Sequence, residues 1–262
     1  MVPLRFWLCS LVVMFMLGSA RADVGHRPAE ATLNDLVARL APEERTRTRG
    51  VYLAFDTSRS DTIADAACDD DGDYVIVLSD AMLDLIDRVS VAVLADDTGA
   101  VLVAYETSLG AQPPGAALLP LPAGGYPRAV DVSGHERVRT EILRYVIGAE
   151  LSHGVSGRLL CPSPTLTRES GDDVWTDNER SAEARAARAL YTTANVAAAD
   201  LRALDWMLAA GSTERGAMAL LDAQGALARA SSYARSHERS SMRASLLHTS
   251  ASEWRAQNDS PR

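Results

Sequence analysis

Glu150 and His153 have side chains that could take part in metal-dependent hydrolysis. In zinc hydrolases built on a helix, two histidines four residues apart bind the ion, and the glutamate after the first histidine polarises the attacking water. Here the frame reads Ala149-Glu150-Leu151-Ser152-His153, so an alanine stands where the first histidine is needed. Glu-x-x-His alone is a weak signal, because on a solvated helix the glutamate is an ordinary exposed or paired acid and the histidine an ordinary helix residue.

An acidic cluster is the second candidate for chemistry. The spacing of Asp69, Asp71, Asp73 and Asp80 is compatible with a calcium loop. The sixth position of such a loop needs glycine, and Tyr74 stands there. We therefore favour a plain acidic turn between two strands.

The Glu-x-x-His pair needs a helix to position it, and the sequence predicts one over residues 138–160. One face of this helix carries, at steps of four, four and three, Ile142, Val146, Glu150 and His153. A loop is expected after this helix, because two prolines follow it closely.

The remaining elements define the fold class. Short β-prone runs predict strands at 51–55 and 73–78, and apolar residues at helical spacing predict helices at 32–40, 81–89, 179–210 (broken near 192–195), 216–228 and 240–248. Thr32 is the expected N-cap of the first helix. Residues 91–106 fit either a hairpin or a helix, and we favour a helix. The sequence thus predicts an α+β protein, predominantly helical, with a small sheet and a Pro- and Gly-rich loop at about 110–130 inserted within one domain.

The segments around this frame resemble a known family, the HtpX-like zinc metallopeptidases. The similar segments are Val146-Ile147-Gly148-Ala149-Glu150-Leu151-Ser152-His153-Gly154 (the zinc-binding helix), 62–68 (the edge strand of the active site), 74–85 (the next strand and helix), 195–211 (the helix with the third ligand) and 235–247 (a closing segment with a histidine and an arginine). Each segment is modest alone, but their order along residues 51–247 matches. The resemblance implies a zincin-like metallopeptidase scaffold formed by residues 23–262 as a single domain.

The same resemblance implies that two of the three zinc ligands are lost. Ala149 occupies the position of the first ligand and Val196 that of the third, and neither side chain can coordinate a metal. Asp200 matches an aspartate that supports the ligands without binding the ion. Catalytic zinc generally needs three protein ligands. We therefore expect no cofactor, with Glu150 an idle general base and His153 a remnant ligand.

A rebuilt zinc site is the alternative. His237 could approach His153 if the closing segment packs against the zinc-binding helix, and Asp200 or Glu179 could add an oxygen ligand. If no metal binds, His237 is an ordinary loop histidine.

The first residues predict export. Arg5, an apolar run at 6–17 and small residues up to Ala22 have the layout of a cleavable secretory signal, with the expected cut after Ala22. The apolar run is shorter than the roughly 20 residues of a membrane span, so no stable span is expected. Removing residues 1–22 changes the net charge from −9 to −11, because two arginines and no acid are lost. An acidic chain without a basic cluster argues against nucleic-acid binding.

Two cysteines remain after the expected cut. Cys68 and Cys161 are expected to form a disulfide in the periplasm or outside the cell. The resemblance supports this pairing, because it places one cysteine at the end of the edge strand and the other after the zinc-binding helix. The alternative is two unpaired, buried thiols.

These observations predict an exported, catalytically inactive metallopeptidase homologue that binds peptides or protein partners at its former active site. The first alternative is an active zinc endopeptidase, either with a rebuilt metal site or with Ala149 as a single recent or engineered change. Val196 argues against the second form, since restoring one histidine would leave two ligands. The other alternative is an exported helical protein of unrelated role. The sequence names no partner and no oligomeric state.

Overall fold

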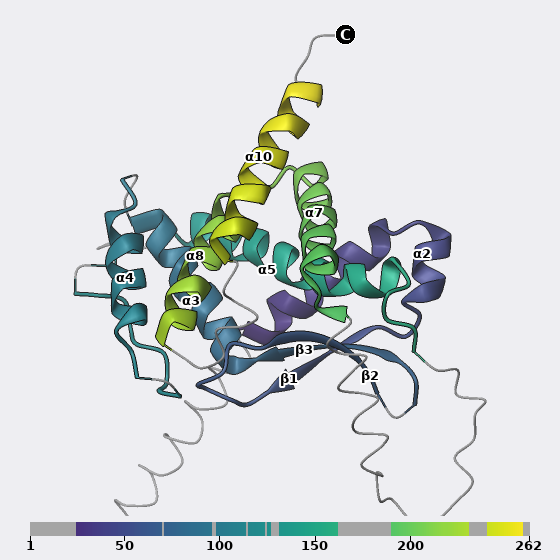
Figure 1. The fold of residues 1–262 in the computed structure, drawn as a ribbon, viewed down its shortest axis with the longest axis horizontal. Helices are drawn as coiled ribbons and strands as arrows, with labels where there is room; N and C mark the ends of the chain where they lie inside the picture. The colour runs from purple at the N-terminus through teal and green to yellow at the C-terminus, as the bar shows by residue number, and fades with distance from the viewer. Residues whose placement is uncertain are drawn as a thin grey trace, which may run out of the picture.

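The computed structural model of the chain describes residues 25–69, 71–95, 98–113, 115–123, 125–126, 131–161, 190–230 and 240–258. The fold is α+β and predominantly helical, with a three-stranded sheet below a group of helices (Figure 1). In chain order the elements are a helix at residues 25–39, α2 (Pro42–Arg47), β1 (Tyr52–Asp56), β2 (Ala64–Cys68), β3 (Tyr74–Ser79), α3 (Asp80–Ala95), α4 (Ala100–Gly110), α5 (Val132–Val155), α7 (Thr193–Ala209), α8 (Arg215–Ala230) and α10 (Ser240–Asn258). The coarse fold class predicted from the sequence is confirmed.

The sheet has the order β1-β3-β2, with β3 in the centre. β1 runs parallel to β3 and β2 runs antiparallel to it. The nearly continuous apolar sequence of β3 suits a central strand covered on both faces, and five of its six residues are buried. Both predicted strands are confirmed, and the segment that resembles an edge strand is a strand at one edge of this sheet.

The pairing of β2 leaves part of its backbone facing away from β3. The backbone N–H of Ser79 donates to the carbonyl of Ile63 at 3.0 Å. Ladder hydrogen bonds recur at every second residue of an antiparallel pair. The next bonded pair is therefore Asp65 with Val77 in the observed register, and the backbone groups of Ala66 point toward the outer edge.

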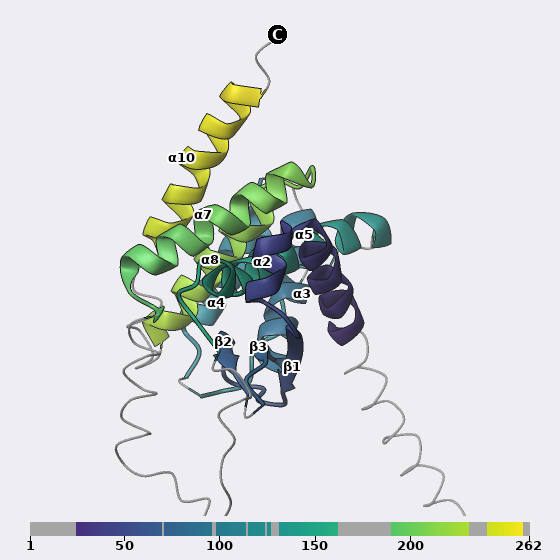
Figure 2. The ribbon, with the colours of Figure 1, turned by 90° about the vertical axis from the view of Figure 1, so that its right-hand side faces the viewer.

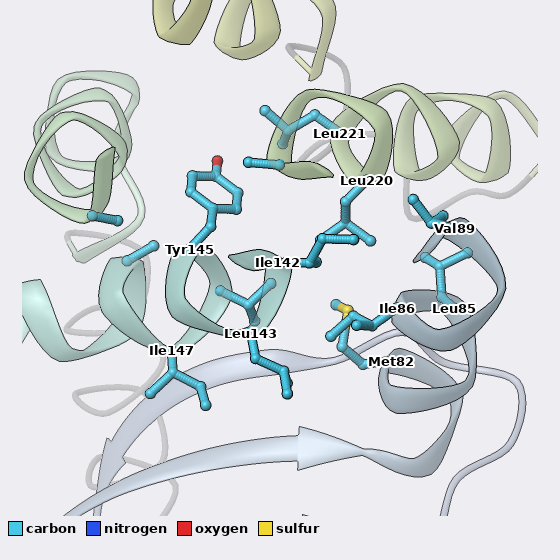
Figure 3. Packing of buried hydrophobic residues seen from close by; sticks show 14 of the residues in the cluster. Met82, Leu85, Ile86, Val89, Ile142, Leu143, Tyr145, Ile147, Leu220 and Leu221 are labelled. Atoms are coloured by element: carbon cyan, nitrogen blue, oxygen red, sulfur yellow. The ribbon is translucent and has the colours of Figure 1, made fainter. Parts of the chain in front are cut away.

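The long helix α5 lies in the centre of the helical group. It packs against α3, α7 and α8 and rests on β2 and β3 (Figures 1 and 2). Ile142, Leu143 and Ile147 point into the core from successive turns and are at most 1% exposed (Figure 3). Side chains of α3 and α8 meet them there, so that the described elements share one hydrophobic cluster.

The bounds of α5 differ from the prediction. The helix begins at Val132, six residues earlier than expected, and ends at Val155. The early turns are stabilised by tertiary contacts, because His135 and Arg139 both lie near the carboxylate of Asp87 on α3, at 3.1 and 3.8 Å. A local apolar pattern cannot reveal such contacts. Gly157, with a φ of +68°, follows the end of the helix.

Other elements confirm or correct the sequence reading. Residues 91–95 complete α3 and residues 100–106 belong to α4, so helix is confirmed over hairpin. The expected N-cap at Thr32 is wrong, because the chain is already helical at residue 25 and the Thr32 hydroxyl donates to the carbonyl of Pro28 at 2.7 Å inside the helix. The break near 192–195 is confirmed, since Thr192 caps α7 by accepting from the backbone N–H of Asn195. Residues 1–22 and 179–189 lie outside the described residues.

A disulfide joins Cys68 and Cys161, with their Cα atoms 5.4 Å apart. It links the end of β2 to the segment that follows α5. The predicted pairing is confirmed, and the alternative of two free thiols is wrong. Among the described helices, none combines the length and the apolar character that crossing a membrane requires.

Replacing both cysteines by serine is expected to lower the free energy of unfolding by about 4 kcal/mol, because the disulfide closes a long loop in the unfolded chain. Urea unfolding of the double variant and of the oxidised wild type measures the difference. The reduced wild type is the control and should match the double variant. An oxidised protein no more stable than either would contradict the expectation.

Candidate functional site

The hydroxyl of Tyr191 connects β2 to α5. It accepts a hydrogen bond from the backbone N–H of Ala66 at 2.9 Å and donates to Oε2 of Glu150 at 2.9 Å. The carboxyl group of Asp65 lies close to Tyr191. The Tyr191 ring meets the ring of His153 edge to face, with centroids 5.3 Å apart. We call these five residues the α5–β2 site.

Tyr74 fixes the turn of α5 that carries the site. Its hydroxyl donates to the carbonyl of Glu150 at 2.6 Å and accepts from the backbone N–H of Gly154 at 3.0 Å. In a regular helix a carbonyl accepts a hydrogen bond from the N–H four residues later. The Tyr74 hydroxyl therefore bonds to both members of one such pair, the carbonyl of Glu150 and the N–H of Gly154. A Cβ on Gly154 would lie 2.5 Å from the Tyr74 ring, and glycine is therefore needed for this approach.

A buried ion pair joins three helices next to the site. Asp200 of α7 is fully buried and accepts two hydrogen bonds from Arg243 of α10, both at 2.7 Å. Tyr145 of α5 donates to the same carboxylate at 2.8 Å and accepts from Arg243 at 3.1 Å. Burial raises the pKa of Tyr145 well above its ordinary value, so the phenol stays neutral and remains a donor.

The resemblance assigns two lost zinc ligands to Ala149 and Val196. Hydrogen bonds lie on both sides of these two positions. The Tyr145–Asp200 hydrogen bond lies one helical turn before Ala149 on α5 and one turn after Val196 on α7. Beyond them, the Arg158 side chain donates to the carbonyl of the residue before Val196 at 2.9 Å. Both positions therefore belong to the α5–α7 interface, where Ala149 is buried and Val196 half-buried.

Few of the described side chains could bind a metal here. The methyl group of Ala149 and the isopropyl group of Val196 offer no donor atom. Within the described ranges, no three His, Cys, Asp or Glu side chains are grouped so that they could hold a metal ion. His237 and Glu179, two of the candidate ligands for a rebuilt site, lie outside those ranges.

Two other histidines lie away from the site. His135 precedes His153 by 18 residues on α5, which corresponds to about 27 Å along the helix axis. The ring of His26 stacks on Phe55 of β1, with centroids 3.8 Å apart. β1 is the opposite edge of the sheet from β2. Neither histidine belongs to the α5–β2 site.

The acidic cluster after β2 is a hydrogen-bonded turn. The carboxylate of Asp69 accepts from the backbone N–H groups of Asp71 and Asp73 at 3.0 and 2.8 Å, and from the Tyr52 hydroxyl at 2.9 Å. These bonds lower the pKa of Asp69, so it is ionised at neutral pH. Asp80 instead opens α3 and pairs with a histidine.

Burial sets the protonation of the site. It raises the pKa of Glu150 to about 8, opposed by the hydrogen bond from Tyr191. It lowers the pKa of His153 to about 4, with the positive charge of Arg158 as a second cause. Burial also raises the pKa of Asp65. Near neutral pH, Glu150 therefore carries a proton and His153 is neutral, with a buried Nδ1 that lacks a hydrogen-bond partner in the described part of the chain.

The sequence identified Glu150 and His153 but missed the tyrosines that position them. Tyr74 and Tyr145 stand within apolar runs, where aromatic residues usually serve the core. Tyr191 directly precedes the N-cap of α7. This position is the one feature of the sequence that could have indicated a role for Tyr191.

No protein-family model matches the chain, and no curated protein or solved structure shows significant similarity to it. The family resemblance therefore rests on the quoted residues and on their order along the chain.

Replacing Arg243 by leucine is expected to lower the free energy of unfolding by about 3–5 kcal/mol, because it leaves the buried carboxylate of Asp200 without its counter-charge. The matched control is Arg39→Leu, which breaks an exposed pair with Asp35 on one helix. That change should cost no more than about 1 kcal/mol. Urea unfolding of both variants measures the contrast, and equal losses would contradict a structural role for the buried pair.

Glu150 and His153 should affect stability in opposite directions. A raised carboxyl pKa stabilises the fold at low pH, and this contribution is lost as the pH rises from 4.5 to about 8. A lowered histidine pKa stabilises the fold above pH 6.5, and this contribution is lost as the pH falls toward about 4. The two slopes oppose each other below pH 6.5, so the Glu150 effect should stand alone between pH 6.5 and 8.

Glu150→Gln isolates the carboxyl contribution. The wild type is expected to lose up to about 1.4 kcal/mol of stability per pH unit relative to the variant between pH 6.5 and 8. Chemical unfolding of both proteins at several pH values measures this difference. Parallel stability curves would show that Glu150 titrates normally.

Proposed function

We propose that this protein is an exported, catalytically inactive relative of the HtpX-like metallopeptidases, built on a zincin-like scaffold. In this proposal the α5–β2 site binds an extended peptide or a segment of a protein partner without cleaving it. The disulfide fits export, because such bonds persist in oxidising compartments.

The Asp200–Arg243 pair is the observation that carries the proposal. Asp200 comes from the segment that resembles the third-ligand helix, and Arg243 from the segment that resembles the closing part of the catalytic domain. Their two hydrogen bonds and the bond from Tyr145 bring both segments to the helix that carries Glu-x-x-His. Segments that are far apart in sequence and that carry parts of the resemblance are therefore in contact, which supports the proposal.

The composition of the site supports the loss of catalysis. A catalytic zinc generally needs three protein ligands and an open position for water. Ala149 and Val196 remove two of these ligands at the α5–α7 interface. The carboxyl group of Glu150 bonds to the Tyr191 hydroxyl and carries a proton near neutral pH, so it is a poor general base.

The position of β2 supports peptide binding. An extended segment can add a strand to a sheet edge through backbone hydrogen bonds. Ala66 directs its backbone groups to the outer edge of β2, next to Glu150 and His153. The binding surface of the proposal thus needs no metal and keeps the remnants of the catalytic helix beside the bound segment.

Restoring the two missing ligands tests the family assignment. The Ala149→His, Val196→Glu double variant is expected to bind one zinc ion per chain with His153, whereas the wild type should contain only substoichiometric zinc. Elemental analysis of the purified proteins measures the metal content. An Ala149→Asn, Val196→Gln variant is the matched control, because its side chains are of similar size but coordinate zinc poorly.

Two results would contradict the proposal in different ways. Stoichiometric zinc in the wild type would support a rebuilt metal site and an active endopeptidase. A double variant with no more zinc than the Asn/Gln control would mean that these two positions do not correspond to lost ligands, and the family assignment would fail.

A further inference from the structure

The Tyr191 hydroxyl accepts a hydrogen bond from a backbone N–H at the outer edge of β2. The N–H of Ala66 points away from β3, and its acceptor is the Tyr191 oxygen at 2.9 Å. When a strand is added to a sheet edge, such an N–H bonds to a carbonyl of the incoming segment. The side-chain oxygen of Tyr191 therefore stands where a backbone oxygen of that segment would lie.

The contacts of Tyr191 suit a side chain that can leave. Tyr191 lies outside α7, just before its N-cap, and is only partly buried. Its polar contacts are hydrogen bonds, each of modest net strength, and its ring meets His153 only edge to face. By contrast, the disulfide at Cys68 fastens the same strand covalently, so β2 keeps its position when Tyr191 moves.

We propose that Tyr191 is a displaceable latch: an extended segment binds the outer edge of β2 only when the Tyr191 side chain releases Ala66 and Glu150. This inference rests on the proposed peptide-binding function and adds its regulation. Release frees two groups at once, the backbone donor of Ala66 and the Oε2 acceptor of Glu150. An incoming segment can then use both.

Charge along the edge selects the occupant. Asp61 precedes β2 and Asp69 follows it directly. The whole chain is acidic, with a net charge of −9. Oppositely charged partners are favoured at such a surface, so the segment that fits is an extended peptide with positive side chains.

Amide hydrogen exchange tests the latch without any ligand. Tyr191→Phe keeps the ring but removes the hydroxyl, and the Ala66 amide is expected to exchange about tenfold faster, since a typical hydrogen bond is lost. Tyr52→Phe is the matched control, because it removes a tyrosine hydroxyl that bonds to Asp69 on the same sheet. Unchanged exchange at Ala66 in Tyr191→Phe would overturn the latch, whereas a change confined to that variant supports it.

Peptide binding tests the consequence. The probe is a synthetic peptide of alternating arginine and valine, capped at both ends, and its affinity is measured by calorimetry for wild type, Tyr191→Phe and Tyr191→Ala. Both Tyr191 variants are expected to bind it about tenfold more tightly than wild type, because binding no longer has to break the Tyr191 hydrogen bonds. Tyr191→Phe decides the matter if Tyr191→Ala folds poorly.

The outcomes separate the two proposals. Equal affinity of the wild type and the Tyr191 variants would overturn the latch and leave peptide binding intact. Binding by none of the three proteins would overturn peptide binding at this edge, and the latch with it.

Discussion

The carboxylate of Asp200 is fully buried, and this constrains how three helices can meet. An isolated charge in an apolar interior is very unfavourable, so such a group needs a counter-charge and hydrogen bonds. Arg243 and Tyr145 provide them from α10 and α5. Moving any one of these helices by a turn would leave a buried charge unpaired. The buried carboxylate therefore fixes α5 and α7 relative to each other at the point where Tyr145 bonds to Asp200.

Because the position of α5 is fixed, the turn of α5 that faces the sheet is fixed as well. Tyr74 reaches from β3 into the helical step between Glu150 and Gly154, and the disulfide ties the end of β2 to the segment after α5. The edge strand and the Glu-x-x-His turn thus have little freedom to move apart. Within this frame, hydrogen bonds and an edge-to-face ring contact link Tyr191 to β2 and α5, and because these contacts are non-covalent the latch is assigned to it.

Local sequence patterns were sufficient to predict most helices and strands, but not the residues at which each of them begins and ends. The strands at 51–55 and 73–78 and the helices at 81–89 and 216–228 were predicted because their periodicity is contained in a few residues. The first residue of α5 and the last residue of α10 could not be predicted in this way. α5 extends toward its N-terminus through contacts with Asp87, and α10 continues to Asn258, where Trp254 packs on the core and Arg255 pairs with Glu214.

The site was only partly predictable for the same reason. Glu150, His153 and the two cysteines could be named from spacing, compartment and resemblance. The contacts that give them their present state span longer distances in sequence: Tyr191 bonds to Glu150 across 41 residues, and Tyr74 to its carbonyl across 76. A tyrosine in an apolar run carries no local sign of such a partner. The polar groups that satisfy a buried acid are therefore found only in the fold.

The opposite pKa shifts of Glu150 and His153 explain how two ionisable residues can remain in the core. Burial keeps the carboxyl group protonated and the imidazole neutral, so neither adds a buried charge near neutral pH. The Tyr191 hydroxyl then satisfies Oε2 of Glu150, an atom that a hydrolytic base would need to keep open to water. The hydrogen bond that makes the acid tolerable in the interior also links it, through Tyr191, to the backbone of β2.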